Sequence, residues 1–373
     1  MNTQISATWY RGGTSKCWFF DAAAVEASGH DVSTVLASAF GASDARQIDG
    51  VGGATSTTSK AAVITPTPGA DADLTYLFAQ VGIGDGRVEY GSNCGNCASA
   101  VGLYALQSGI VAPTGDVTDV RMFNENSDTT LVARVQTPGG EVLFTGEETI
   151  PGHQAPGVRV DLGFERPSGR STGRLLPTGN ALDELADDSG LLMRATLIDA
   201  GAPACLIPAA DLGLTATELP VEFAASVPEL KRWQRLAALA MGLATPEDPI
   251  SDAIPKVGVV GAPRDYVALD GTEIAASDYD IAVRMVSMHA PHPAIGITSA
   301  VAVAAAGGVE GSTVARILPA WDGNARERTI RLGTPVGVIE TAITLDEHGD
   351  AALVSTKRVA RRIAAATIDL ALA

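Results

Sequence analysis

The sequence predicts an α+β protein made of two similar, strand-rich domains, each with one central helix. At 373 residues the chain is too long for one ordinary core. Short runs of β-branched and aromatic residues, separated by turn residues, occur in both halves. Two segments of the first half also reappear in order in the second. Thr8–Phe19 resembles Thr196–Ile207, with Gly201 at the position of Gly13, and the helical segment from Ala98 resembles the one from Thr298.

The first half begins with a strand, a tight turn and a second strand. The predicted strands are Ala7–Tyr10 and Cys17–Phe20, and the turn is Arg11–Lys16. A small-residue helix is expected at Ala98–Ser108, since Gly109 would end it. The remaining expected strands of this half are Lys60–Ile64, Leu74–Val81, Val120–Phe123, Leu131–Gln136 and Glu141–Thr145.

A Pro/Gly-rich stretch at Pro151–Gly179 separates the halves, and Thr172–Asn180 is the predicted linker within it. We therefore expect domains at residues 1–180 and 181–373, with the C-terminal segment able to pack back on the first domain. A helix at Val227–Gly242 belongs to the second half only.

Charge and hydropathy limit the partners. With 26 basic and 43 acidic residues the net charge is −17, which argues against nucleic-acid binding. An anionic ligand must then be held by local cations and backbone N–H groups. The longest apolar tract, Ile297–Gly308, is too short for a membrane span and predicts a buried helix. With no signal-peptide pattern and no disulfide framework among four cysteines, we expect a cytoplasmic protein without membrane partners.

The most informative motif is GSNCGNCAS, residues 91–99. A Gly/Asn-rich loop before a helix places backbone N–H groups at the helix N-terminus, where a carboxylate can bind and a thiolate is favoured. This context makes Cys94 a candidate functional thiol. The alternative is that Cys94 is a small buried apolar residue and Asn96 a helix cap.

Cys94 and Cys97 also form a CxxC pair. A zinc site would need a second pair of ligands, and the chain has no other CxxC. His289 and His292 lie in an extended Pro-rich segment, without the helical spacing of zinc-binding histidines. A redox role of the CxxC pair stays an alternative, and we expect no metal and no other cofactor.

Two Gly/Ser/Thr-rich turns each contain a lysine: Arg11–Lys16 and Gly52–Lys60. Neither has the spacing of a phosphate-binding P-loop. Their N–H and O–H donors, with one cation each, suit carboxylate binding. Lys60 leads directly into an apolar run, so its amine could be partly desolvated and act as a base.

On these motifs the sequence resembles the PrpF family, which has the diaminopimelate-epimerase-like fold. The three matching blocks are RGGTSK near the N-terminus, DGVGGATSTTSK, and NCGN before the first helix. Other similar positions are Asn126, the IDAGAP segment, Pro255-Lys256 and MHAPHPAIG, so the resemblance covers nearly the whole chain in order.

The resemblance implies two similar domains, each a curved, mostly antiparallel sheet around a central helix, with the active site in the interdomain cleft. It implies a cofactor-independent isomerase or tautomerase that shifts a proton and a double bond on a small di- or tricarboxylate, such as 2-methylaconitate or 4-oxalomesaconate. Lys60 and Cys94 would be the acid/base pair, and a homodimer is possible. The implied substrate contacts are Arg11, Gly12, Gly13, Thr14, Ser15, Lys16, Ser59, Asn93, Gly95, Asn96, Asn126, His289 and Thr298.

The chain departs from its relatives at several positions. Racemases and epimerases of this fold use two opposed cysteines, but the second helix here begins at Ile297-Thr298-Ser299, without a thiol. Cys97 stands where many family members have a larger apolar residue, and Cys17 where glycine is common. A racemase, epimerase or dehydratase acting on an amino or imino acid remains an alternative, as does a polycarboxylate-binding accessory protein without turnover.

Overall fold

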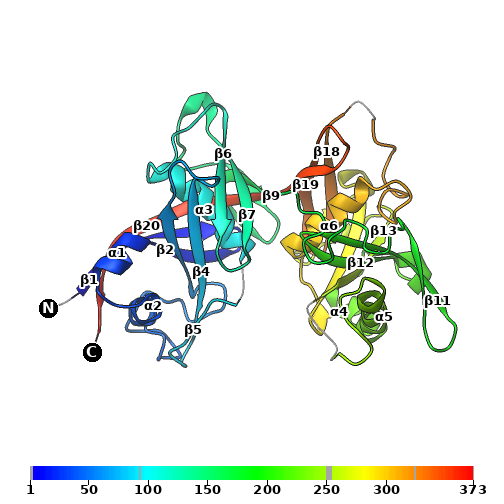
Figure 1. The fold of residues 1–373 in the computed structure, drawn as a ribbon, viewed down its shortest axis with the longest axis horizontal. Helices are drawn as coiled ribbons and strands as arrows, with labels where there is room; N and C mark the ends of the chain where they lie inside the picture. Colours follow the sequence, from blue (N-terminus) through cyan, green and yellow to red (C-terminus); the bar gives the residue numbers. More distant parts are fainter. Residues whose placement is uncertain (1–2, 92–93, 249–253, 323–324, 373) are drawn as a thin grey trace. The chain divides into compact units, whose positions relative to one another are not determined.

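The computed structural model describes residues 3–91, 94–248, 254–322 and 325–372. The fold is strand-rich and mixed, with parallel and antiparallel pairings (Figure 1). The chain divides into two compact units, which we call unit 1 (Met1–Gly163 with Lys357–Ala373) and unit 2 (Phe164–Thr356). Both boundaries fall inside long strands.

The first boundary between these units lies at Gly163, whereas the sequence predicted a boundary at residue 180. The Pro/Gly-rich segment after residue 163 is attached to unit 2 rather than being a free linker. Within it, the Gly169 N–H donates to the Asp199 carbonyl at 2.7 Å, and the Asp199 N–H donates to the Leu175 carbonyl at 2.8 Å. The C-terminal segment belongs to unit 1, because the strand Ala351–Leu370 pairs there with the first strand of the chain.

Nine strands form most of unit 1: β1 (Thr3–Gly12), β2 (Ser15–Asp21), β3 (Lys60–Pro66), β4 (Leu74–Val81), β6 (Val117–Asn124), β7 (Thr129–Gln136), β8 (Glu148–Ile150), β9 (His153–Glu165) and β20 (Ala351–Leu370), with the short β5 (Val88–Glu89) beside β4. Their pairings close into a ring in the order β20-β1-β2-β3-β4-β6-β7-β9-β20. Each of the eight strands in this ring is paired on both sides, whereas β8 pairs with β9 outside the ring.

Helix α3 (Gly95–Gln107) packs against β1, β2, β6 and β7 of this ring (Figure 1). From Cys97 to Leu103 every residue is buried, as expected for a helix that is apolar on all sides. Small residues make this possible: a Cβ at Gly102 would collide with the Cβ of Ala133 on β7. The predicted helix Ala98–Ser108 therefore forms, beginning three residues earlier.

The other face of the same sheet is covered by two helices, α1 (Ala22–Ala27) and α2 (Val32–Phe40). Both begin at aspartates, Asp21 and Asp31, whose carboxylates accept backbone N–H groups of the first turn. We call this the outer face and the α3 side the inner face. Residues packed on the outer face include Trp18, Ala61, Val63, Ala79 and Val81.

Unit 2 also contains a buried helix, α6 (Ile297–Gly307), which packs against β11 (Leu192–Ala200), β12 (Ala202–Pro208) and β19 (Gly337–Leu345) (Figure 1). Its strands pair in the order β10-β11-β12-β13-β16-β18-β19-β20. The further elements are β10 (Asp183–Ala186), α4 (Pro220–Phe223), α5 (Val227–Ala240), β13 (Lys256–Gly261), β14 (Tyr266–Val267), β15 (Glu273–Ile274), β16 (Ile281–Ser287), β17 (Ala290–Pro291) and β18 (Glu327–Thr334).

Two sequence expectations concern segments outside the site. The apolar tract at 297–308 forms the buried helix α6, as predicted, and within the described residues no helix is both long and apolar enough to cross a membrane. The predicted strand Glu141–Thr145 was wrong. That segment is irregular, Phe144 is 54% exposed, and the Leu143 carbonyl accepts a hydrogen bond from Gln107 on α3.

Candidate active site

Lys60 is the first residue of β3 and points to the inner face, because the next residue, Ala61, packs on the outer face. Its Nζ donates to Oε1 of Gln80 on β4 at 2.7 Å and lies 5.1 Å from the ring centroid of Phe78. Gln80 in turn donates to the Ser59 carbonyl at 2.9 Å. The amine is thus half-buried and held in one orientation.

Three cysteine thiols form a chain beside Lys60. Cys94 is the N-cap of α3 and half-buried, whereas Cys97 and Cys17 are buried. The thiol of Cys94 is hydrogen-bonded to that of Cys97, and Cys97 to that of Cys17 on β2. The Lys60 charge is close enough to act on both Cys94 and Cys97. Within the described residues, no three His, Cys, Asp or Glu side chains are arranged to hold a metal ion.

The thiol environment is opposite to the one that the sequence suggested. A helix N-terminus was expected to favour the Cys94 thiolate, yet the pKa of Cys94 is raised well above its usual value. The hydrogen bond with Cys97 is the largest cause and burial the second, and together they outweigh the nearby Lys60 cation. The pKa of Cys97 is also raised, mainly by burial. Cys94 therefore stands as a neutral thiol, able to give a proton.

The turn between β1 and β2 is packed against the first turn of α3. A Cβ at Gly12 would meet the Asn96 carbonyl, and one at Gly13 would meet the Asn96 side chain. Gly13 also has φ of +51°, a conformation that favours glycine. The Asn96 Nδ2 donates to the Thr14 Oγ1 at 3.0 Å, which fixes the turn to the helix. Gly12, Gly13, Thr14 and Asn96 are thus brought together at the start of α3, and their contact with a substrate stays a prediction.

Arg11 and Lys16, the two cations of this turn, point away from α3. They are paired across β1 and β2 and lie on the outer face, where the Lys16 Nζ sits 4.7 Å from the Trp9 ring centroid. The Arg11 Nη2 donates to the Pro156 carbonyl at 2.6 Å. The expectation that these cations meet a carboxylate beside Lys60 and Cys94 is corrected by strand alternation, which sends them to the opposite face.

Two further candidate contacts have structural roles. Ser59 is completely buried and its hydroxyl donates to Oε1 of Gln47 at 2.6 Å. The Asn126 amide holds three backbone groups: it accepts from the Phe78 N–H and donates to the Phe78 and Tyr90 carbonyls, each at 2.8 Å. It also accepts from Asn124, so its hydrogen-bonding capacity is filled. Asn126 positions β4, with Phe78 under Lys60, instead of facing a ligand.

The other candidates are distributed as follows. Gly95 is the first residue of α3, and Ser15 is buried and is the first residue of β2. Asn93 lies outside the described residues. His289 and Thr298 belong to unit 2, where His289 is exposed and Thr298 lies in the first turn of α6. Their part in a site with Lys60 stays a prediction.

Sequence reasoning missed the two glutamines that hold the loop before Lys60. Gln80 anchors the amine itself, and Gln47, which is 2% exposed, joins Ser59 to the Ala54 N–H and the Gly82 carbonyl. Gln80 sits in a strand with alternating apolar residues, where a polar side chain on the buried face is the available signal. Gln47 has no such pattern around it.

We expect replacement of Gln80 by leucine to lower kcat by about 10- to 100-fold, because Lys60 would lose the acceptor that orients it. Turnover of a competent substrate would be measured with circular dichroism on the same samples. Gln4→Leu, which removes an exposed glutamine paired with Asp369, is the control and should leave kcat unchanged. Wild-type turnover by Gln80→Leu would contradict the orienting role.

Replacing Cys97 by alanine should lower the pKa of Cys94, because the largest cause that raises it is removed. Below that pKa the thiolate fraction then increases, so alkylation of Cys94 by iodoacetamide should become faster at any fixed pH. The rate is followed across pH by mass spectrometry of the Cys94 peptide. Cys205→Ala, a buried thiol of unit 2, should have no effect. An unchanged alkylation profile for Cys97→Ala would contradict this account.

A held amine and a neutral thiol thus lie close together at the start of a buried helix, an arrangement that suits an enzyme. Comparisons with known proteins agree on an enzyme. The family model described as PrpF protein matches residues 2–371. The chain belongs to the PrpF family, which confirms the resemblance seen in its motifs.

Characterised relatives are similar over nearly their whole length. The 4-oxalomesaconate tautomerase of Pseudomonas putida is 39% identical over 93% of this chain and 91% of its own. The 2-methyl-aconitate isomerase of Shewanella oneidensis is 34% identical, with the same coverage of 93% and 91%. The solved structure of methylitaconate-delta-isomerase superposes with a TM-score of 0.89 at 30% identity, covering 99% of this chain and 96% of that one. The chain is thus an isomerase-type enzyme by family.

Proposed function

We propose that this enzyme shifts a proton, and with it a double bond, on a small unsaturated di- or tricarboxylate. The observation that carries the proposal is the close grouping of Lys60 and the Cys94 thiol at the N-terminus of α3. The substrates named for the relatives, 2-methylaconitate, 4-oxalomesaconate and methylitaconate, support the substrate class.

In the proposed reaction the Lys60 amine acts as the base and removes a proton from a carbon next to a double bond that is conjugated to a carboxylate or keto group. The C–H electrons form a new double bond, and the former double bond delocalises its electrons onto the oxygen as a dienolate. Cys94 then gives its S–H proton to the α-carbon, the carbon of the former double bond that bears the carboxylate or keto group, so the double bond is left between the β- and γ-carbons. This leaves an ammonium and a thiolate, and transfer of the proton from Lys60 to Cys94 restores the starting state.

Two features of the site favour this assignment of roles. The raised pKa of Cys94 keeps the thiol protonated, as an acid must be. The Lys60 charge stabilises the thiolate that forms when the proton is given. Negative charge on the dienolate would be stabilised by backbone N–H groups of the first turn of α3, which carry a partial positive charge.

We also propose that units 1 and 2 are two similar domains of the diaminopimelate-epimerase-like fold. The support is local. In unit 1 the β1–β2 turn places Gly13, with positive φ, against the first turn of α3. In unit 2 the β11–β12 turn places Gly201, with φ of +70°, against Val301 and the Thr298 carbonyl in α6. These are the two glycines that the internal repeat aligns.

Deuterium exchange tests the function directly. The protein would be incubated in D₂O with cis-aconitate, 2-methylaconitate or 4-oxalomesaconate and followed by ¹H NMR. An isomerase incorporates deuterium at the migrating position and produces the shifted isomer. Binding of these acids without exchange would replace the proposal by a polycarboxylate-binding protein. Exchange of the α-proton of proline or hydroxyproline, but not of these acids, would replace it by an amino-acid epimerase.

A further inference from the structure

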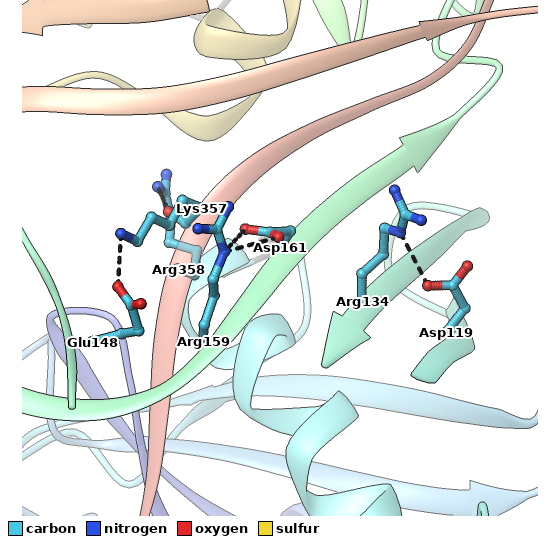
Figure 2. Close-up of polar contacts among 7 residues, drawn as sticks. All are labelled: Asp119, Arg134, Glu148, Arg159, Asp161, Lys357 and Arg358. Atoms are coloured by element: carbon cyan, nitrogen blue, oxygen red, sulfur yellow. Dashed lines mark hydrogen bonds and ion pairs between the residues drawn. The ribbon is translucent and has the colours of Figure 1, made fainter. Parts of the chain in front are cut away.

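Arg358, in β20, is a buried arginine for which the described residues provide no carboxylate partner. It is 5% exposed; its Nη1 donates to the Lys357 carbonyl at 2.7 Å, and its Nε has no hydrogen-bond partner within the described part of the chain. Figure 2 shows the contrast with its neighbours: Lys357 is joined to Glu148 at 2.9 Å and Arg159 to Asp161 at 3.1 Å, whereas no dashed line reaches Arg358.

Strand register places Arg358 on the inner face of unit 1. Ala360 pairs with Gly12, and a Cβ at Gly12 points at Asn96 in the first turn of α3. Residues opposite each other in an antiparallel pair share a face, as do residues two apart in a strand. Ala360 and Arg358 therefore both face the α3 side. They face away from the side that carries Arg11 and Lys16.

Arg358 is also level with the turn that closes over the N-terminus of α3. The Gly13 N–H of that turn donates to the Val359 carbonyl at 2.9 Å, one residue from Arg358. Along β20, Arg358 lies about 7 Å beyond Ala360, at about 3.3 Å per residue. The side chain thus lies past the first turn of α3, at the end where the helix presents backbone N–H groups.

A buried guanidinium without an ion-pair partner lowers the stability of the folded protein. Burying a charge without a partner costs several kcal/mol in real proteins. Burial alone lowers the pKa of Arg358, to about 10, so the group keeps its charge at neutral pH. Residues that lower the stability of the folded protein are common at functional sites, where a bound ligand can supply the missing partner. In a protein of net charge −17, such a local cation is also what an anionic ligand requires.

We propose that Arg358 binds a carboxylate of the substrate beside the N-terminus of α3. This inference rests on the proposed function, which supplies a polycarboxylate. The guanidinium donates its free Nε–H to the carboxylate in a charge-assisted hydrogen bond, and the helix N–H groups add to the same positive field. Arg358 takes the role that the sequence had suggested for Arg11 and Lys16, from the opposite side of the sheet.

The test measures binding separately from turnover. Tricarballylate, a saturated tricarboxylate that cannot isomerise, is titrated into wild type, Arg358→Met and Arg358→Lys by calorimetry. We expect Arg358→Met to weaken Kd about 30-fold or more, since it removes a buried charged hydrogen bond. Arg358→Lys should fall between the two. Arg134→Gln, which removes an exposed arginine of the same unit, controls for net charge and should bind as wild type (Figure 2).

Thermal unfolding without ligand distinguishes a binding residue from a structural one. If Arg358 is held for a ligand, Arg358→Met relieves an unpaired buried charge, so Tm should stay the same or rise, and tricarballylate should no longer raise it. A lower Tm or failure to fold for Arg358→Met, with a wild-type Kd for Arg358→Lys, would identify a structural arginine and overturn the proposal.

The remaining outcomes separate this inference from the function on which it rests. Wild-type Kd in a folded Arg358→Met, with deuterium exchange intact in the wild type, overturns the Arg358 assignment alone. A wild type that neither binds tricarballylate nor exchanges protons of unsaturated polycarboxylates overturns the proposed function, and the Arg358 assignment with it.

Discussion

Replacing Lys60 by alanine should lower kcat by about 10²–10⁴-fold, the range that positioned proton transfer contributes. The residue is held by Gln80 beside the thiol chain, so its replacement removes the proposed base from that position. Cys94→Ala should cause a loss of the same order, whereas Cys97→Ala should be milder because that thiol is buried one turn into the helix. The measurement is deuterium incorporation into a competent substrate, with circular dichroism to verify the fold.

Lys16→Ala is the matched control for this experiment. Its side chain stacks on Trp9 at the outer face, so its loss should leave kcat within about twofold of wild type. Undiminished exchange by folded Lys60→Ala and Cys94→Ala would refute the mechanism. A Lys16→Ala variant as inactive as Lys60→Ala would instead show that the outer face takes part in catalysis.

A Gly12→Ala variant should lose both stability and activity. Its Cβ would overlap the backbone carbonyl of Asn96, which cannot move away as the tip of a flexible side chain could. Overpacking of this kind typically costs about 1–3 kcal/mol, and relief by shifting α3 would displace Cys94 from Lys60. We expect a Tm lower by several degrees and kcat reduced about 100-fold.

The control for this substitution is Gly115→Ala. Gly115 has no heavy atom within 4 Å of an added Cβ and no positive φ, so its change should be nearly neutral in both measurements. Differential scanning fluorimetry and the turnover assay on the same preparations separate the two effects. If Gly12→Ala unfolds at the temperature of Gly115→Ala and turns over normally, the tight contact between the turn and α3 is not required.

The sequence was sufficient for residues whose role depends on local pattern. The Gly/Asn-rich block before a small-residue helix predicted that Cys94 would lie at a helix start, and the glycines of the first turn predicted a close approach. The main strands of the first half followed from β-branched runs. Helices α1 and α2 were not predicted, although Asp21 and Asp31 are ordinary N-caps. Both helices are short and lie between segments with a strand pattern.

The predictions that failed concern properties that depend on the face of a strand that a residue occupies and on neighbours distant in the sequence. Arg11 and Lys16 share a motif with Gly12 and Gly13, yet strand alternation sends the cations to the opposite face. The pKa of Cys94 depends on Cys97, in the same helix, and on Lys60, which belongs to strand β3. Arg358 could not be connected to this region from sequence alone, since it is 346 residues from Gly12 along the chain and joins it only through β20.

The internal repeat shows the same limit. Cys205 aligns with Cys17, but Cys17 faces α3, whereas Cys205 packs with Leu197 and Trp233 on the α5 side of its sheet. The hairpins differ in their connection: Gly12 pairs with Ser15 across two residues, and Ala200 pairs with Ala202 across one. A one-residue difference reverses the face of every following side chain. The thiol chain is therefore confined to unit 1.

Strand β20 also sets the order in which the protein can be completed during synthesis. It supplies the link of the unit 1 ring between β1 and β9, yet its unit 1 part, from Lys357, follows all of unit 2 in the sequence. Domains generally fold as they emerge from the ribosome, N-terminal first. Here unit 1 cannot close until β20 has emerged, while unit 2 has all its residues by Thr356. The nascent enzyme therefore carries an open sheet edge in unit 1 until β20 is made, and deletion of residues 357–373 would leave that edge open.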